Sequence, residues 1–288
     1  MSLRRQLLRP TLHSIAHRGL LTTLRALVLS SLRFLPQTFR PVAPPLDPYP
    51  RATPLIAHPF DDAFAVNTSG YLRGDQLNTA PGDSVPLHGS ALWSTAYYGI
   101  APSIFDRALA LTEDAIRAHS SSPDPNPFAR FSFVDLGCGK GRALLLSSRF
   151  PFRDVLGVEL DPTLAHVAQQ NLETFSAPWQ QTRALRVLHA DATAVDLPLT
   201  PTILFLYNPF LAPVLRRVLQ RLERSLRAHP RELWLLYINP EAAHALANHP
   251  RFVEHTRTLL HVTPEDALPD RLGVHTEEVA LFRYHPPT

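Results

Sequence analysis

Three glycines at alternate positions follow an apolar run in the middle of the chain, and this spacing is the first sign of chemistry. The run Phe131–Leu136 is rich in β-branched and aromatic residues and predicts a buried strand, which ends in Gly137, Gly139 and Gly141. Helix formers follow, with no proline before Pro151. Glycine lets a backbone approach a ligand closely and exposes its N–H groups. A strand, a glycine turn and a helix N-terminus in this order are therefore typical of a parallel α/β sheet that seats a nucleoside ligand.

The spacing of the glycines narrows the choice of ligand. A dinucleotide-binding turn has the pattern G-x-G-x-x-G, whereas here the third glycine comes one position early and Arg142 stands where the last glycine would be. A phosphate-binding loop of the type G-x-x-x-x-G-K-[ST] is excluded, because Lys140 is not followed by serine or threonine. The pattern Asp-x-Gly-x-Gly-x-Gly, which begins at Asp135, fits better.

Acidic residues stand at the ends of three consecutive predicted strands. Asp135 lies near the end of the first, Glu159 ends the second and Asp191 ends the third. An open α/β sheet binds its ligands at the carboxyl ends of its strands, so these side chains should lie along one crevice. A carboxylate there can accept both hydrogen bonds from the vicinal hydroxyls of a ribose, and we assign this role to Glu159. Asp161 and Pro162 predict the start of the next helix.

The stretch Val134–Gly141 resembles the first motif of the class I S-adenosylmethionine-dependent methyltransferases. The resemblance covers about residues 90–288. It is strongest to a bacterial group that combines Val-Asp-Leu-Gly-x-Gly-Lys-Gly-Arg, Gly-Val-Glu-Leu and Tyr-Asn-Pro-Phe, and it extends more distantly to the non-SET lysine methyltransferases. It implies an α/β fold with a doubly wound, mostly parallel, seven-stranded sheet. The remaining strands are then expected at 202–207, 232–238, 252–261 and 277–284, the last two as an antiparallel pair.

The resemblance implies S-adenosylmethionine as the cofactor and gives each acidic residue a part of it. Asp135 and the glycine turn would hold the methionine moiety, and Tyr98, just before the leading helix, would close over it. Asp191 would lie near the adenine, where it could accept from the exocyclic amine. An aspartate after a strand is equally typical of a turn or a helix cap, so both interpretations stay open.

The triplet Asn208-Pro209-Phe210 follows the fourth predicted strand and bears on which chemical group receives the methyl group. At this place many methyltransferases that act on amino groups carry Asp/Asn-Pro-Pro-aromatic, whose polar groups accept from the target nitrogen. The resemblance therefore favours N-methylation of an amine on a protein or a small molecule. The second proline is missing here, so the triplet could also be a turn that ends a strand, with Phe210 in the core. The methyl acceptor itself is not determined by the sequence.

Charge and proline content divide the chain before its catalytic part. Residues 1–46 contain seven arginines and no acidic residue, which leaves 21 basic and 25 acidic residues for the remainder. We expect a basic amphipathic arm at 1–40 and a proline-rich linker at 41–55. An irregular rim segment at 56–100 and the methyltransferase domain at 101–288 should follow. The arm could dock as a helix on its own domain, lie on a membrane surface or an anionic partner, or act as a transit peptide.

Other functions receive less support from the sequence. A non-catalytic S-adenosylmethionine-binding protein, tethered to a membrane or to nucleic acid by its basic arm, is the alternative, and a nicotinamide-dependent oxidoreductase is disfavoured by the glycine spacing. Cys138 is the only cysteine, which excludes an internal disulfide and favours a cytoplasmic protein, with peripheral membrane attachment through the arm left open. The scattered histidines predict no metal site, and no specific nucleic-acid partner is expected.

Overall fold

The computed structural model describes residues 57–74, 76–77, 89–121, 124–269 and 274–286. The predicted arm 1–40, with its helix, and the linker 41–55 lie outside the described residues.

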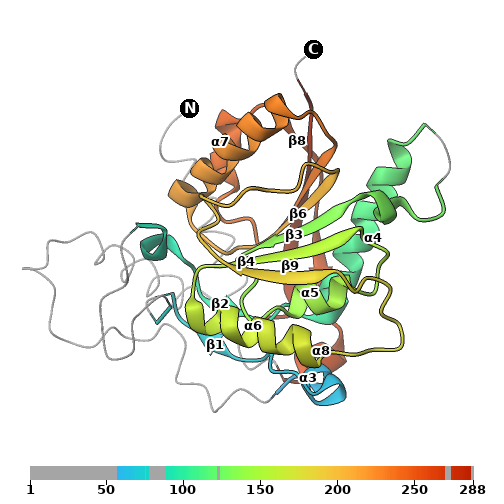
Figure 1. Ribbon diagram of the computed structural model, residues 1–288, viewed down its shortest axis with the longest axis vertical. Helices are drawn as coiled ribbons and strands as arrows, with labels where there is room; N and C mark the ends of the chain where they lie inside the picture. Colours follow the sequence, from blue (N-terminus) through green and yellow to red (C-terminus); the bar gives the residue numbers. More distant parts are fainter. Residues whose placement is uncertain (1–56, 75, 78–88, 122–123, 270–273, 287–288) are drawn as a thin grey trace, which may run out of the picture.

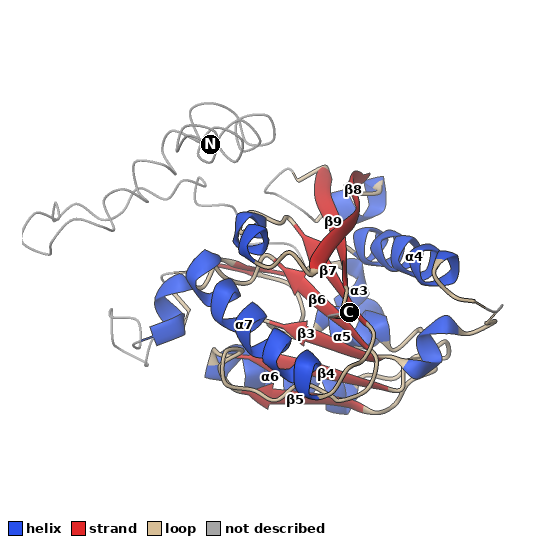
Figure 2. Cartoon of the chain, turned by 90° about the horizontal axis from the view of Figure 1, so that it is seen from above, coloured by secondary structure: helices blue, strands red, loops and turns tan. Residues whose placement is uncertain are grey.

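A seven-stranded sheet organises the described chain (Figures 1 and 2), and its strands follow the order β5, β4, β3, β6, β7, β9, β8. Their bounds are β3 (Ser132–Leu136), β4 (Asp154–Glu159), β5 (Leu185–His189), β6 (Thr202–Tyr207), β7 (Leu233–Ile238), β8 (Phe252–His261) and β9 (Thr276–Tyr284). Strands β3 to β7 pair in parallel, whereas β9 is antiparallel to both β7 and β8. This confirms the doubly wound, mostly parallel, seven-stranded sheet that the sequence predicted.

Two apolar cores lie on the two faces of this sheet, because successive side chains of a strand point to opposite sides. In β3, Phe133 belongs to the core that contains the helices α4 (Pro102–Ala118) and α5 (Arg142–Ser147). Its neighbour Val134 belongs to the core under α7 (Ala212–Ala228). Figure 2 shows α4 and α7 on opposite sides of the strands. The sheet is thus buried on both faces, as parallel sheets are.

Helix α6 (Pro162–Thr174) follows β4 and packs against β4 and β5. Its start confirms the prediction from the sequence: Asp161 Oδ1 accepts hydrogen bonds from the N–H groups of Thr163 and Leu164, both at 2.9 Å, and Pro162 is the first helical residue. The helix therefore begins directly after the carboxyl end of β4, beside Glu159.

Short elements complete the described chain. They are α3 (Pro59–Phe64), β1 (Tyr71–Leu72), η2 (Gly89–Trp93), β2 (Tyr97–Tyr98), η3 (Pro127–Arg130), η4 (Ala243–Asn248) and α8 (Pro264–Ala267). Within the described ranges, no helix combines the length and the hydrophobicity needed to cross a membrane.

Replacing Phe133 by alanine tests the core that supports the glycine turn. Its ring centroid lies 5.9 Å from that of Phe105 and 5.6 Å from that of Phe205, and the side chain is fully buried. We expect the free energy of unfolding, measured by urea titration, to fall by about 3–5 kcal/mol. The exposed Leu199 is the control, and Leu199→Ala should change it by less than about 0.5 kcal/mol. Equal losses in both variants would contradict this account of the core.

Candidate ligand-binding cleft

The glycine turn between β3 and α5 has a backbone conformation that favours glycine. Gly137, Gly139 and Gly141 have φ angles of 85°, 55° and 86°. A Cβ on Gly139 would lie 2.3 Å from the ring of Tyr97, and one on Gly137 would lie 2.4 Å from Pro209 Cβ. Two of these glycines are therefore required for close packing as well as for the turn.

The N–H groups of the turn are bonded within the protein. Those of Gly137 and Cys138 donate to the carbonyl of Val158 at 2.8 and 3.1 Å, and that of Gly139 donates to Glu159 Oε2 at 2.8 Å. The N–H of Gly141 donates to the carbonyl of Cys138 at 2.8 Å. The sequence suggested that the glycines expose these groups to a ligand; instead, the end of the adjacent β4 supplies most of their acceptors. The turn contributes space for a ligand rather than these four donors.

Glu159 lies at the carboxyl end of β4 and connects the turn to helix α6. Its Oε1 accepts from the N–H of Asp161 at 2.8 Å, while Oε2 holds Gly139. Burial raises the pKa of this carboxyl above its usual value, against the lowering effect of the backbone N–H groups of Asp161, Gly139 and Leu160. A carboxylate oxygen has more than one acceptor position, so both oxygens can still accept from a ligand.

Asp135 lies beside Glu159 on the neighbouring strand and is only 2% exposed. Burial, and then the charge of Glu159, raise its pKa well above the usual value. Two adjacent carboxyl groups in one buried crevice favour a ligand that brings hydrogen-bond donors and positive charge.

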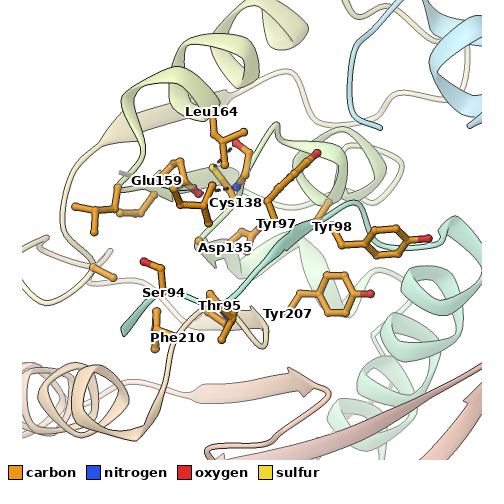
Figure 3. Close-up of a pocket in the computed structure, with 18 of the residues that line it drawn as sticks. Ser94, Thr95, Tyr97, Tyr98, Asp135, Cys138, Glu159, Leu164, Tyr207 and Phe210 are labelled. Atoms are coloured by element: carbon orange, nitrogen blue, oxygen red, sulfur yellow. Dashed lines mark hydrogen bonds between the residues drawn. The ribbon is translucent and has the colours of Figure 1, made fainter. Parts of the chain in front are cut away.

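A cleft enclosing about 860 Å³ of empty space, in part open to solvent, runs along the carboxyl ends of β3, β4 and β6. Figure 3 shows Asp135, Cys138 and Glu159 on one side of this cleft, and Thr95 and Phe210 on the other. Eight residues singled out from the sequence line it: Tyr98, Asp135, Gly137, Gly139, Glu159, Asp191, Pro209 and Phe210. Among the described residues, Gly141 and Asn208 are the two singled out that do not.

Asp191 lines the cleft and also caps a turn. Its Oδ1 accepts from both the N–H and the hydroxyl of Thr193 at 2.7 Å. Burial alone would raise its pKa, but the Ser90 hydroxyl and these two donors outweigh burial and lower it. The capping interpretation is thus observed directly, and because Asp191 also lines the cleft, the contact with adenine stays a prediction.

Gly141 and Asn208 serve the backbone around the cleft. Gly141 precedes α5, and a Cβ there would contact Ala168 at 3.4 Å. Asn208 follows β6 with a φ angle of 42°, and its carbonyl accepts from the Thr95 hydroxyl. The N–H of Thr95 in turn donates to the carbonyl of Pro209 at 3.2 Å. The segment before β2 is thereby joined to the end of β6, across the cleft from Glu159.

Sequence reasoning missed several residues of the cleft. Tyr97 and Arg142 line it, although the sequence directed attention to Tyr98 and to the glycines. Tyr207, the residue before Asn208, also lines it. Burial raises the pKa of the Cys138 thiol well above its usual value, so this cysteine stays protonated and unreactive. No group of histidine, cysteine and acidic side chains in the described ranges could hold a metal ion.

Comparisons with known proteins add a fold-level likeness. No protein-family model matches the chain, and no curated protein matches it. Among solved structures it is similar to a Thermoplasma acidophilum protein (13% identity, TM-score 0.42, 65% of this chain and 90% of that one). It is also similar to the ribosomal protein L11 methylase of Lactobacillus delbrueckii subsp. bulgaricus (14%, 0.39, 62% and 79%) and to TrmN of Thermus thermophilus (16%, 0.41, 65% and 49%). The fold assignment rests on the strand order and register.

Gly139→Ala tests the close approach of Tyr97 to the turn. The new methyl group would meet the Tyr97 ring and occupy a positive φ, so we expect a loss of about 2–4 kcal/mol in the free energy of unfolding. Gly89→Ala is the matched control, since Gly89 has a φ of 88° with nothing within 4 Å of its missing Cβ. It should cost only about 1 kcal/mol. If urea titration gives the same loss for both, the Tyr97 contact does not constrain the turn.

Proposed function

We propose that this chain is an S-adenosylmethionine-dependent methyltransferase of class I. The observation that carries the proposal is the convergence of Asp135, Glu159 and Asp191 on one cleft, at the carboxyl ends of β3, β4 and β5. Adjacent strand ends of a doubly wound sheet are where such folds bind nucleoside ligands.

The residues of the cleft fit this cofactor. Asp135 and Glu159 are buried, and burial raises their pKa, so a positively charged ligand with hydroxyl donors would stabilise their ionised forms. Glu159 would accept from the ribose hydroxyls, Asp135 would face the methionine moiety, and Asp191 would lie near the adenine. Tyr98, from the opposite wall, would cover the methionine end. When bound, S-adenosylmethionine supplies a methyl group on a positively charged sulfur atom.

A nicotinamide dinucleotide fits less well. Its pyrophosphate would use free N–H groups at the glycine turn, and four of these are bonded inside the protein. Arg142 cannot serve as a free phosphate ligand, because its guanidinium donates to Thr68, Ser69, Gly99 and Ile100. Thermal shifts with S-adenosylhomocysteine and with NAD separate the two ligands.

We favour an amine as the methyl acceptor. Tyr207 lines the cleft, and its hydroxyl donates to Glu277 Oε1 at 2.7 Å, so a buried carboxylate fixes the position of this hydroxyl. Asn208 does not line the cleft, and its Oδ1 is buried without a hydrogen-bond partner in the described part of the chain, so contact with the acceptor would require this side chain to turn toward the cleft. These groups would orient an amine nitrogen in line with the methyl group, and orientation is a main source of rate in such a reaction.

Glu159→Gln tests the ribose assignment. The amide keeps the size of the side chain but loses the charge, and hydrogen bonds to charged groups contribute about 1.5–3 kcal/mol each. We expect the Kd for S-adenosylhomocysteine, measured by calorimetry, to rise at least about tenfold. The control is Glu173→Gln on the exposed face of α6, which should leave the Kd unchanged. An unchanged Kd in a folded Glu159→Gln protein would refute the assignment.

Tyr207→Phe tests the acceptor side separately. With labelled S-adenosylmethionine and a cell lysate, we expect transfer of the label to fall at least about tenfold while the Kd for S-adenosylhomocysteine stays within about twofold. Tyr284→Phe, which removes a buried hydroxyl at the opposite end of β9, is the control and should transfer normally. A tenfold loss of cofactor affinity in Tyr207→Phe would instead place this side chain on the cofactor side.

The contact of the arm 1–40 with a membrane surface or an anionic partner stays a prediction. It can be examined by salt-dependent binding of the full chain to anionic vesicles.

A further inference from the structure

A segment that precedes the sheet lies against the glycine turn. We call residues 57–72 the strap: it contains α3 and β1, and β1 pairs with β2 through Tyr71 opposite Tyr98 and Leu72 opposite Tyr97. In Figure 1, α3 and α8 are neighbours at the lower edge of the molecule. His58 Nε2 lies 3.2 Å from Asp266 Oδ1 there, which fixes the start of the strap to α8.

Asp61 and Arg142 form the first connection between the strap and the turn. Both side chains are only 5% exposed, and Arg142 lies 3.6 Å from Asp61 Oδ1. Asp61 Oδ2 accepts from the N–H groups of Thr68 and Ser69 at 2.8 and 2.7 Å, so one carboxylate shapes the bend of the strap. Arg142 donates to the side chains of the same two residues, at 2.6 and 2.9 Å. Arg142 also begins α5, directly after Gly141.

Lys140 and Asn171 form the second connection. Lys140 Nζ donates to Asn67 Oδ1 at 2.9 Å and to the carbonyl of Ser69 at 2.6 Å. Asn171, from α6, accepts from the N–H of Asn67 at 2.8 Å and donates both to its carbonyl at 2.9 Å and to the carbonyl of Lys140 at 2.8 Å. Because the Lys140 carbonyl and the Gly141 N–H belong to one peptide plane, Asn171 also fixes the direction of that N–H.

Tyr97 forms the third connection and reaches the cleft itself. Its hydroxyl donates to the carbonyl of Thr68 at 2.6 Å, and the phenol interacts with the backbone N–H of Lys140. Its ring fills the space over Gly139 that a Cβ would occupy. A displacement of the strap would therefore move the wall of the cleft next to the Gly139 N–H, the group that Glu159 holds.

We propose that the strap is part of the cofactor site, with Asp61 and Asn171 as positioning residues that hold the glycine turn in its binding conformation through Thr68, Lys140 and Tyr97. This inference rests on the proposed function for the identity of the ligand. Neither Asp61 nor Asn171 lines the cleft, so their effect on a ligand must pass through the turn.

The coupling must be reciprocal, since a strap that improves ligand binding is itself stabilised by the ligand. Ligand binding should thus slow hydrogen exchange at the N–H groups of Thr68 and Ser69, although no residue of the strap lines the cleft. A strap that merely covered the core would show no such response.

The experiment compares Asp61→Asn and Asn171→Leu with the full-length wild-type chain. The matched control is Thr182→Val, which removes a buried hydroxyl that lies within hydrogen-bond distance of two backbone carbonyls, those of Phe150 and Phe152. Three quantities are measured for each protein: stability in urea, the Kd for S-adenosylhomocysteine by calorimetry, and hydrogen exchange of the peptide spanning 137–142 without ligand.

We expect both strap variants to remain folded, as the urea titration will show. In the folded variants, the Kd should rise at least about tenfold, and hydrogen exchange of the peptide 137–142 should become at least about tenfold faster. Thr182→Val should leave both within twofold, even where its loss of stability is the same. Wild-type Kd and exchange in folded strap variants would overturn the proposal while leaving the methyltransferase assignment intact. If the wild type binds no S-adenosylhomocysteine, the assignment of the cofactor is refuted. Unchanged hydrogen exchange of the turn in the strap variants would in that case also refute the coupling between the strap and the turn.

Discussion

Two carboxyl groups in one buried crevice are the constraint on which the rest of the site depends. Parallel pairing of β3 with β4 sets Asp135 opposite Gly157, two residues before Glu159, so both acidic side chains reach the same edge of the sheet. Burial raises the pKa of both. A folded-state pKa above the unfolded value means that the folded protein holds its proton longer, so these groups lower stability as pH rises through that window. Ionisation of Asp135 and Glu159 therefore destabilises the fold, and a positively charged ligand with hydrogen-bond donors would offset this loss of stability.

The glycine turn makes the close spacing of these groups possible. Gly157 has no side chain, and a Cβ there would lie 2.8 Å from Cys138 Sγ, so the turn can pack directly on β4. From that position it donates its N–H groups to Val158 and Glu159. Each bond holds either the turn or the carboxylate in place. The protein's own hydrogen bonds therefore fix the conformation of the turn, which would reduce the ordering required for the proposed ligand to bind.

Local patterns were sufficient to predict the elements that form one wall of the cleft. The strand before Gly137, the acid at the end of β4 and the cap at Asp161 each depend on residues close together in the chain, where propensity and spacing act directly. The choice between Tyr97 and Tyr98 could not be made in this way. Tyr97 and Tyr98 form the two-residue strand β2, so their side chains point to opposite sides of it. Both residues line the cleft, but Tyr97 is the one that packs on Gly139.

Contacts between residues that are far apart in the chain could not be predicted from the sequence. Asp61 and Arg142 form a buried ion pair across the length of chain that separates the strap from α5. Nothing in the pattern around either residue indicates the other, and an arginine after a glycine turn is more often exposed than buried. Asn208 shows a different limit: its motif lacks the second proline and left two interpretations open, and the left-handed backbone at that position directs its carbonyl, rather than its side chain, to Thr95.

The antiparallel strand β9 holds Tyr207, on the proposed acceptor side, for a topological reason. The parallel strands all end at one edge of the sheet, so a strand that runs in the reverse direction must begin at that edge. β9 begins at Thr276, and Glu277 follows as a buried residue that accepts from Tyr207 at the end of β6 and from Asn239 after β7. Asn239, like Asn208, precedes a proline and has a positive φ, of 49°. Because β9 runs in the reverse direction, its first residues bring the carboxylate of Glu277 to the edge where the parallel strands end. This carboxylate holds the hydroxyl of Tyr207, which lines the cleft.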